Sequence, residues 1–328
     1  MPTPRAVRAL SLFSGIGAFE LAAATTPRRG KAPIVVRAHA EIDPNADAVY
    51  RYHFPDIPNL GDVAALSAAQ VCPIAVPARA KEWGRGGYDL LVAGFPCQDL
   101  SVGNLTGRGL KGKRSGLFWD VVRMLERDAP RYFLFENVLP RERAEVDVIS
   151  NALGVQPVMI DAATFTGQRR KRYFWCNWSV PALPKTSGPR LVDALDPVAE
   201  VDPDLAHTQT AIDYMGRYGG KGHADRWHRG HHGDTDLDKA PTLPKNLQKG
   251  QPYNVLIDRR FDPPLVRRYS ATEVERLFGY PEDWTRYGVY EGRDGKPVTR
   301  EVAYTRRLAM LGNTISVPVM AHILKGLP

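Results

Sequence analysis

Residues 88–101 read Tyr88-Asp89-Leu90-Leu91-Val92-Ala93-Gly94-Phe95-Pro96-Cys97-Gln98-Asp99-Leu100-Ser101. The apolar run at the start of this stretch predicts a buried strand, and Gly94 lets the chain leave that strand sharply. Pro96 fixes its own backbone φ, so we expect the Cys97 thiol to be held in the loop that follows. Open parallel α/β sheets bind their ligands at this edge. A lone cysteine is more often a small buried hydrophobic residue, so its setting must decide between that role and a nucleophile.

Short apolar runs alternate with helical patterns between residues 7 and 178. This alternation predicts an α/β fold with a doubly wound, mostly parallel sheet. The expected strands cover residues 7–13, 34–41, 89–93, 132–136, 155–161 and 172–178. The expected helices between them cover residues 18–24, 45–53, 63–71, 117–127 and 142–153.

The character of the chain changes near Pro181. From there to about residue 264 it is rich in proline, glycine, histidine and charge, which fits either a solvated loop or a small recognition domain built from loops. The four histidines within residues 223–232 lack the spacing of a zinc site. A capping box, Ser270-Ala271-Thr272-Glu273, predicts a helix that runs through Leu277, and a last helix is expected over about residues 316–325.

The composition limits the class of protein. The 328 residues are 43% hydrophobic and 24% charged, as in ordinary folded proteins. The net charge of +8 favours a polyanionic partner such as nucleic acid, although many basic proteins bind none. No apolar run reaches the length of a membrane span and no signal-peptide core is present, so we expect a cytoplasmic protein without membrane contact. The three cysteines, Cys72, Cys97 and Cys176, lack metal-ligand spacing and predict neither a disulfide framework nor a metal site.

The first turn from strand to helix reads Leu12-Phe13-Ser14-Gly15-Ile16-Gly17-Ala18-Phe19-Glu20. Its two glycines let the backbone approach a ligand at the helix N-terminus. Glu41 ends the second expected strand, where an acid commonly binds ribose hydroxyls, and Asp62 stands where it can accept a hydrogen bond from an adenine amino group. Acids at strand ends are also ordinary helix caps. Together the three features favour a cofactor that contains adenosine.

Two further groups stand at the ends of expected strands. Phe133-Leu134-Phe135-Glu136-Asn137-Val138 places a carboxylate beside the strand that leads to Cys97, although an acid here is also a common N-cap. The run Gln168-Arg169-Arg170-Lys171-Arg172 is usually only a solvated face. Because an aromatic strand follows it, however, Arg170 and Arg172 are expected to project to one face, where they can hold a phosphate or a base carbonyl.

In their order along the chain, these segments resemble the motifs of the DNA (cytosine-5)-methyltransferase family. The matching segments are Phe13-Ser14-Gly15-Ile16-Gly17, Glu41, Gly61-Asp62-Val63, Pro96-Cys97-Gln98, Glu136-Asn137-Val138, Gln168-Arg169-Arg170-Lys171-Arg172, Arg267 with Glu273, Arg276-Leu277-Phe278-Gly279-Tyr280-Pro281 and Gly312-Asn313-Thr314-Ile315. The resemblance covers nearly the whole chain except about residues 181–264, where family members differ because this segment reads the target sequence. Ile42, Asp99-Leu100 and Thr314 depart from the family pattern, which bears on cofactor affinity rather than on the chemistry.

The resemblance implies a Rossmann-like class I methyltransferase, an α/β protein whose doubly wound, mostly parallel sheet carries an inserted small target-recognition domain. Residues 1–180 and 265–328 would form the catalytic domain that binds S-adenosylmethionine, and residues 181–264 would form the target-recognition domain. The implied reaction is methyl transfer from S-adenosylmethionine to C5 of cytosine in a specific sequence of double-stranded DNA, as in restriction-modification systems. A monomer without an obligate protein partner is expected.

The implied catalytic residues are Cys97, Glu136, Arg170 and Arg172. Cys97 would add to C6 of a cytosine that is flipped out of the helix, and Glu136 would hydrogen-bond the N3/N4 edge of the base. Arg170 and Arg172 would hold the O2 atom and the Cys97 loop.

The remaining implied site residues fall into two groups. The cofactor would contact Phe13, Ser14, Gly15, Ile16, Gly17, Glu41, Ile42, Asp62, Val63, Pro96, Leu117, Asn313 and Thr314. DNA would contact Gln98, Ser101, Lys111, Lys113, Arg114, Gln168, Arg217, Lys221, Arg226, Lys245 and Asn246. Most of the DNA contacts are expected at phosphates, which carry no sequence information.

Two alternatives stay open. One is a transfer-RNA cytosine-5 methyltransferase of the same superfamily, which the large, basic, glycine-rich variable segment disfavours. The other is a catalytically inactive DNA-binding relative, which the presence of Cys97, Glu136 and both arginines disfavours. The recognition sequence and the biological role cannot be derived from the residues.

Overall fold

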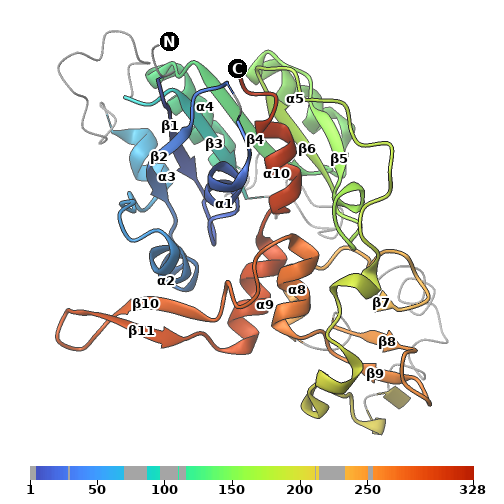
Figure 1. The fold of residues 1–328 in the computed structure, drawn as a ribbon. Coiled ribbons are helices and arrows are strands. Elements are labelled where there is room, and N and C mark those ends of the chain that lie inside the picture. The colour runs from blue at the N-terminus through green and yellow to red at the C-terminus, as the bar shows by residue number, and fades with distance from the viewer. Residues whose placement is uncertain are drawn as a thin grey trace. The chain divides into compact units, whose positions relative to one another are not determined.

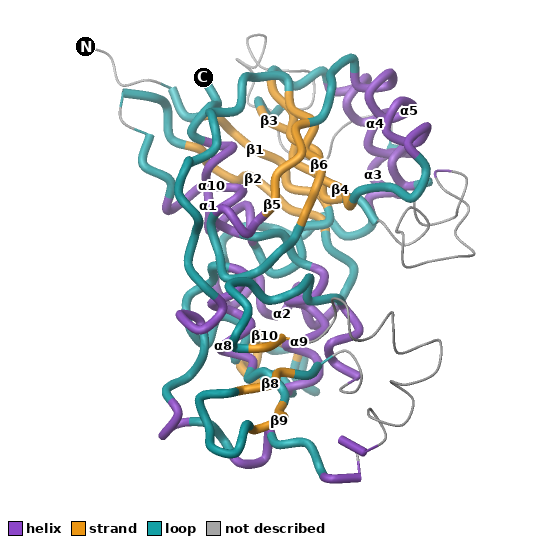
Figure 2. The backbone as a smooth tube through the Cα atoms, turned by 90° about the vertical axis from the view of Figure 1, so that its right-hand side faces the viewer, coloured by secondary structure: helices purple, strands orange, loops and turns teal. Residues whose placement is uncertain are grey.

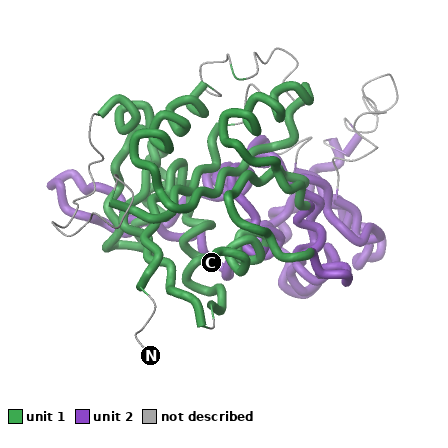
Figure 3. Tube along the Cα trace, turned by 90° about the horizontal axis from the view of Figure 1, so that it is seen from above, with its two compact units in different colours: residues 1–160, 171–182, 319–328 green, residues 161–170, 183–318 purple. Residues whose placement is uncertain are grey.

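The computed structural model describes residues 5–28, 30–69, 87–96, 110, 116–210, 212–213, 233–249 and 254–328. The chain divides into two compact units (Figure 3). The first, which we call the sheet unit, comprises residues 1–160, 171–182 and 319–328. The second unit comprises residues 161–170 and 183–318. The catalytic and target-recognition domains expected from the sequence remain a prediction.

Within the described residues, a six-stranded sheet forms the centre of the sheet unit, in the order β2-β1-β3-β4-β6-β5 (Figure 1). Its strands are β1 (Val7–Leu12), β2 (Ile34–Ala40), β3 (Leu90–Gly94), β4 (Tyr132–Val138), β5 (Val158–Asp161) and β6 (Lys171–Cys176). Strands β1, β2, β3 and β4 pair in parallel, whereas β6 runs antiparallel to β4. The predicted α/β fold with a mostly parallel sheet is confirmed.

The central strands are buried, and most of their side chains are apolar on both faces. The first four residues of β3 and the first six of β4 are buried, as expected for strands covered by helices on both sides. Helices α1 and α10 lie on one face of the sheet, and α3, α4 and α5 lie on the other (Figure 2). Leu10, Leu91, Phe118, Phe135 and Trp175 fill the core between these layers.

The helices of the sheet unit begin near their predicted starts. They are α1 (Ala18–Thr25), α2 (Pro44–His53), α3 (Val63–Ala68), α4 (Leu117–Asp128), α5 (Arg143–Leu153) and α10 (Val317–Leu324). Asp43 caps α2 by accepting the N–H groups of Asn45 and Ala46, and Asp62 caps α3 by accepting the N–H of Ala64. Helix α3 ends three residues earlier than predicted, because Ala69 has an extended backbone.

Helices α8 (Ala271–Phe278) and α9 (Tyr304–Asn313) belong to the second unit. The predicted capping box opens α8, since Ser270 accepts the N–H of Glu273 and Glu273 accepts the N–H of Ser270. The strands are β7 (Gly233–Asp234), β8 (Leu256–Asp258) and β9 (Leu265–Arg267) in one sheet and β10 (Tyr287–Glu291) and β11 (Pro297–Glu301) in a hairpin.

Short 3₁₀ helices connect these elements. They are η3 (Ala162–Thr164), η4 (Leu191–Ala194), η5 (Val198–Glu200), η6 (Pro203–Leu205) and η7 (Lys245–Lys249). Within the ranges that the structure describes, no helix is both long enough and apolar enough to cross a membrane.

Candidate active site

The turn after β1 has an unusual backbone. Phe13 has a φ of 53°, a left-handed conformation that costs free energy for a residue with a side chain. Gly15 and Gly17 follow with φ values of 56° and 85°, and Gly17 caps α1. A Cβ atom on Gly15 would meet no other atom within 4 Å, so the backbone there faces open space. This is the geometry needed for a ligand to approach the main chain closely.

Glu41 ties this turn to the end of β2. Its Oε2 accepts the N–H of Gly15 at 2.9 Å, and its Oε1 accepts the N–H groups of Ile42 and Asp43, each at 2.8 Å. Burial raises the pKa of the Glu41 carboxyl. A carboxylate has about four acceptor positions, so these three bonds leave one for a ligand hydroxyl. The neighbouring Ile42 side chain is 73% exposed and offers an apolar surface beside the acid.

The remaining predicted cofactor residues of the sheet unit lie on or near the same edge of the sheet. Asp62 is exposed at the start of α3, and Val63 is buried behind it. Ser14 bonds through Oγ to Nδ1 of the buried His39 at 2.8 Å. Ile16 is buried in the glycine turn, and Leu117 is the first residue of α4.

Glu136 lies where β4 meets β3, since the register pairs it with Gly94. Its side chain is 9% exposed at the residue level, and its Oε1 lies 3.1 Å from Nε of Arg172 on β6. Arg172 also donates from Nη1 to the carbonyl of Lys171. The ion pair therefore orients the carboxylate at the end of the strand that neighbours the predicted nucleophile loop.

Asn137 is a buried residue for which the sequence alone indicates no individual role. Its Nδ2 donates to the carbonyl of Phe95 at 3.0 Å, and its Oδ1 accepts the N–H of Val138. The amide thus fixes the chain at Phe95-Pro96, directly before the predicted nucleophile. The position of Asn137 in a buried strand could have indicated these bonds, because a polar side chain between buried residues needs partners inside the protein.

Arg170 belongs to the second unit, where it bonds to main-chain carbonyls. Its guanidinium donates to the carbonyls of Leu243, Gly312 and Thr314 at 2.9–3.1 Å and stacks over the Phe278 ring. These bonds join three distant segments of the second unit. They account for three of the five N–H donors of the guanidinium. The predicted hold on the base and the Cys97 loop stays a prediction, because Cys97 lies outside the described residues.

Gln168 also has contacts inside the protein. It is completely buried, donates to the carbonyl of Leu277 and accepts the N–H of Leu243. This burial differs from the expected DNA contact, which requires an accessible side chain.

The other predicted residues of the second unit lie near Arg170 or at the surface. Thr314 is buried, and its hydroxyl bonds to the Tyr280 hydroxyl at 2.6 Å, while Asn313 is exposed at the end of α9. Lys245 is exposed at the start of η7, followed by Asn246. The predicted residues that lie outside the described ranges are Cys97, Gln98, Ser101, Lys111, Lys113, Arg114, Arg217, Lys221 and Arg226.

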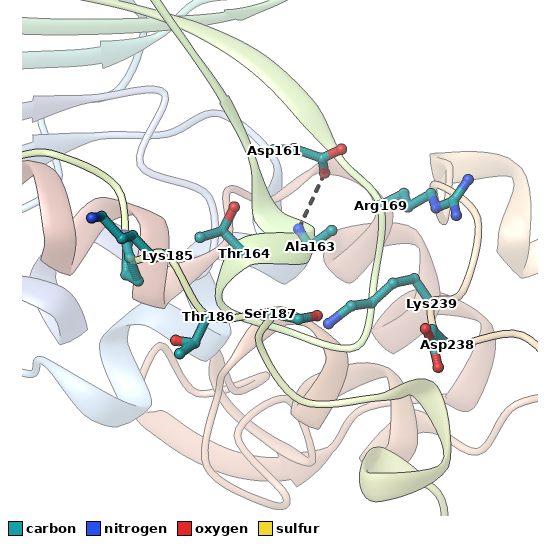
Figure 4. Close-up of a pocket in the computed structure, with 10 residues that line it drawn as sticks. Asp161, Ala163, Thr164, Arg169, Lys185, Thr186, Ser187, Asp238 and Lys239 are labelled. Carbon is teal, nitrogen blue, oxygen red and sulfur yellow. Dashed lines mark hydrogen bonds between the residues drawn. The ribbon is translucent and has the colours of Figure 1, made fainter.

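A polar groove of about 470 Å³ lies in the second unit (Figure 4). Lys239 lines it, but its ammonium group donates to the carbonyls of Thr166, Gly188 and Pro189. These three bonds use all of its donors. In Figure 4 the Arg169 and Lys185 side chains point away from each other. We therefore interpret Lys239 as a support for the loop at Gly188.

Among the described residues, no cluster of His, Cys, Asp and Glu could hold a metal ion.

The buried Glu20 makes stability depend on pH. This residue of α1 is 3% exposed, and burial raises its pKa from 4.5 to about 7. Between these pH values the folded state keeps a proton that the unfolded state releases, so stability is lost as pH rises through this window. We expect about 3 kcal/mol less stability at pH 8 than at pH 4 from this group alone. In urea unfolding, Glu20→Gln should remove this fall in the free energy of unfolding between pH 4 and pH 8. An unchanged slope would show that Glu20 is not its cause.

Comparison with known proteins identifies the family. The profile described as "C-5 cytosine-specific DNA methylase" matches residues 7–179, which is more than half of the chain. The chain belongs to this family. It is 26% identical to the type II methyltransferase M2.BsuMI of Bacillus subtilis (strain 168) over 97% of this chain and 74% of that protein. It is 28% identical to the type II methyltransferase M.HpaII of Haemophilus parainfluenzae over 50% of this chain and 44% of that protein.

Solved structures share the fold of this family member. The Entamoeba histolytica methyltransferase EhMeth has a TM-score of 0.69 at 15% identity, with 98% of each chain covered. The S. pombe Dnmt2 methyltransferase has a TM-score of 0.65 at 18% identity, with 97% of each chain covered. At these identities the likeness concerns the fold alone.

Proposed function

We propose that this methylase-family enzyme transfers a methyl group from S-adenosylmethionine to C5 of cytosine in a specific sequence of double-stranded DNA. One observation carries the proposal: the loop that leads to Cys97 leaves the sheet beside the Glu136–Arg172 ion pair. Gly94 pairs with Glu136, and Asn137 bonds the carbonyl of Phe95. These contacts support a site in which the nucleophile that follows Pro96 and a polar group for the base share one edge of the sheet.

The sheet edge fits S-adenosylmethionine, which supplies an electrophilic methyl group when bound. The open space at Gly15 admits a close approach to the backbone of the first turn. Glu41 would accept a ribose hydroxyl, Asp62 would face the adenine amino group, and the exposed Ile42 would cover one side of the ring. We extend the site to Asn313 and Thr314 as further cofactor contacts.

The proposed reaction begins with Cys97. Its thiolate would form a bond from Sγ to C6 of the flipped cytosine, which would make C5 nucleophilic enough to take the methyl group. The S–CH3 bond of the donor would break in this transfer, leaving S-adenosylhomocysteine. Loss of the C5 proton then breaks the bond from Sγ to C6 and releases the methylated base. Glu136 would hydrogen-bond the N3/N4 edge throughout, and Arg172 would hold Glu136 in place and contact O2.

Replacing Glu136 tests this assignment. Glu136→Gln removes the negative charge but keeps the shape, so we expect the rate of methyl transfer in a single turnover to fall by about 10²–10⁴-fold. Glu126→Gln, an exposed change on α4, is the control and should keep the wild-type rate. A rate for Glu136→Gln within about threefold of the wild-type rate would show that Glu136 is not a catalytic residue.

Replacing the two glycines of the first turn by alanine is expected to have different effects, on stability at Gly17 and on cofactor binding at Gly15. A Cβ on Gly17 would lie 2.6 Å from Cε2 of Phe54, so Gly17→Ala should destabilise the fold by about 2 kcal/mol. A Cβ on Gly15 would meet no protein atom, so Gly15→Ala should cost only about 1 kcal/mol of backbone strain but obstruct the cofactor. Urea unfolding and calorimetric titration with S-adenosylmethionine separate the two effects. The reverse order of effects would contradict the assignment of the turn.

The DNA contacts remain proposals. Lys111, Lys113 and Arg114 are proposed to bind phosphates from a basic, glycine-rich loop, as are Arg217, Lys221 and Arg226 in the variable segment. Lys245 and Asn246 are proposed near the bases, because Lys245 is exposed beside the segment that Arg170 holds. Gln98 and Ser101 complete the set.

Transfer of tritiated methyl groups tests the function as a whole. With S-adenosylmethionine as donor, we expect label in the C5 position of cytosine in duplex DNA and none in transfer RNA. Label in transfer RNA alone would show that the substrate is transfer RNA and not duplex DNA. Binding of DNA without any transfer would favour an inactive DNA-binding relative.

A further inference from the structure

Asn59 lies between two of the loops that form the proposed adenosine site. It lies in the segment that runs beside β2, where it forms a parallel bridge with His39. The Asn59 side chain is exposed, yet it makes four hydrogen bonds. An exposed amide normally bonds to water, so four bonds within the protein point to a constrained position.

The four bonds use the full capacity of the amide. Its Oδ1 accepts the N–H of Glu41 at 3.1 Å and the N–H of Gly61 at 2.9 Å. Its Nδ2 donates to the carbonyl of Glu41 at 2.9 Å and to Oδ1 of Asp47 at 2.8 Å. An asparagine side chain has two donors and two lone pairs on its oxygen, so no other orientation satisfies this environment.

These bonds connect the two acids proposed to recognise adenosine. Asn59 holds both main-chain polar groups of Glu41, and it also holds Gly61, the residue directly before Asp62. Gly61 has a φ of 77°, so the turn at Asp62 depends on a left-handed residue that the amide fixes. Glu41 in turn holds Gly15 through its carboxylate. Asn59 thus sets the separation between the ribose and adenine contacts.

The amide is itself anchored to a helix. Asp47 lies on α2, where its Oδ2 forms an ion pair with Nε of Arg51 at 3.0 Å, four residues further along. The acid that receives the Asn59 Nδ2–H therefore belongs to a regular element rather than to another loop. This anchoring lets one side chain transmit the rigidity of α2 to both loops.

We propose that Asn59 is the positioning residue for the adenosine half of S-adenosylmethionine, acting through Glu41 and Asp62 without touching the cofactor. This inference rests on the proposed function. Removing the amide loosens both loops, while the catalytic edge at Glu136 keeps its own contacts. Cofactor affinity should therefore fall while the rate at saturating cofactor is retained.

The test compares Asn59→Ala with wild type and with Asn151→Ala, a change at an exposed asparagine on α5. We expect Asn59→Ala to raise the Kd and the KM for S-adenosylmethionine by about 10–100-fold, the effect of losing hydrogen bonds that order a site. The kcat at saturating cofactor and the KM for DNA should stay within about twofold, a change of under 0.5 kcal/mol. Asn151→Ala should match wild type in every measurement.

A double variant separates positioning from a general loss of structure. If Asn59 acts through Glu41, then Asn59→Ala should weaken binding much less in a Glu41→Gln background than in wild type. Asn59→Asp keeps the Oδ1 acceptor but places a carboxylate against Asp47. If Asn59→Ala folds poorly, Asn59→Asp serves in its place, and we expect it to raise the KM for S-adenosylmethionine by the same factor.

The outcomes are distinguishable. A Kd for Asn59→Ala equal to that of wild type, or fully additive effects with Glu41→Gln, would overturn the inference while the proposed function stands. Failure of the wild-type protein to bind S-adenosylmethionine at all would instead overturn the proposed function.

Discussion

Cys97→Ser is expected to abolish methyl transfer, with a loss of about 10⁴-fold or more, the scale seen when a covalent nucleophile is removed. Serine is nearly the same size, but its hydroxyl remains protonated at neutral pH and is a far weaker nucleophile than a thiolate. Binding of S-adenosylmethionine and DNA should persist, because neither depends on the sulfur. Single-turnover transfer and calorimetric titration measure the two quantities separately. If Cys97→Ser still transfers methyl groups at about a tenth of the wild-type rate, covalent catalysis by Cys97 would be contradicted.

Arg267 is expected to produce the largest loss of stability. Its side chain is completely buried, with Nε bonded to Asp258 at 3.0 Å and both Nη atoms bonded to Glu273 at 2.6–2.8 Å. Glu273 also closes the capping box of α8. Arg267→Met fills a similar volume but leaves the buried Glu273 carboxylate without its cation, which should cost about 3–5 kcal/mol. Asp258 keeps its ion pair with Arg260.

An exposed ion pair of the same second unit provides the matched control. Arg259 bonds to Asp234 at 2.9 Å, but its side chain is 43% exposed. Solvent screens such a pair, so Arg259→Met should destabilise the protein far less than Arg267→Met. Urea unfolding of both variants checks the comparison, and equal losses would show that burial does not determine the contribution of these pairs.

The sheet could be predicted from the sequence because its strands are continuous apolar runs. Leu90–Gly94 and Tyr132–Val138 are buried along nearly their whole length, so a periodicity argument is sufficient. The polar residues that end the strands could be placed for the same reason, since parallel strands bring their carboxyl ends to one edge. Glu41 and Glu136 were found in this way.

Contacts between residues far apart in the sequence could not be predicted. Arg170 reaches carbonyls 73, 142 and 144 residues further along the chain, and a carbonyl leaves no mark in a sequence. The same reason hid the role of Asn59, whose partners are mostly main-chain groups. Spacing predicted a shared face for Arg170 and Arg172, whereas the bonds of Arg170 to these main-chain carbonyls became visible only in the structure.

Two elements of the second unit lacked the usual sequence signals. Every residue of β11 is exposed, so the hairpin shows no alternation of apolar and polar side chains. Helix α9 begins after Ala303, which offers no capping side chain, and it has no acid in its first turn. Without a start signal, its apolar residues could not be separated from those of the following segment.

The most direct test of the account is covalent trapping with a duplex of random sequence in which every cytosine carries fluorine at C5. After Cys97 adds to C6 and the methyl group is transferred, C5 has no proton to lose, so the enzyme should remain bonded to the DNA. We expect an adduct that survives denaturation, requires S-adenosylmethionine, and maps to the peptide that contains Cys97. Cys97→Ser should give none. An equal adduct with Cys97→Ser, or an adduct that maps to the buried Cys176, would contradict the account.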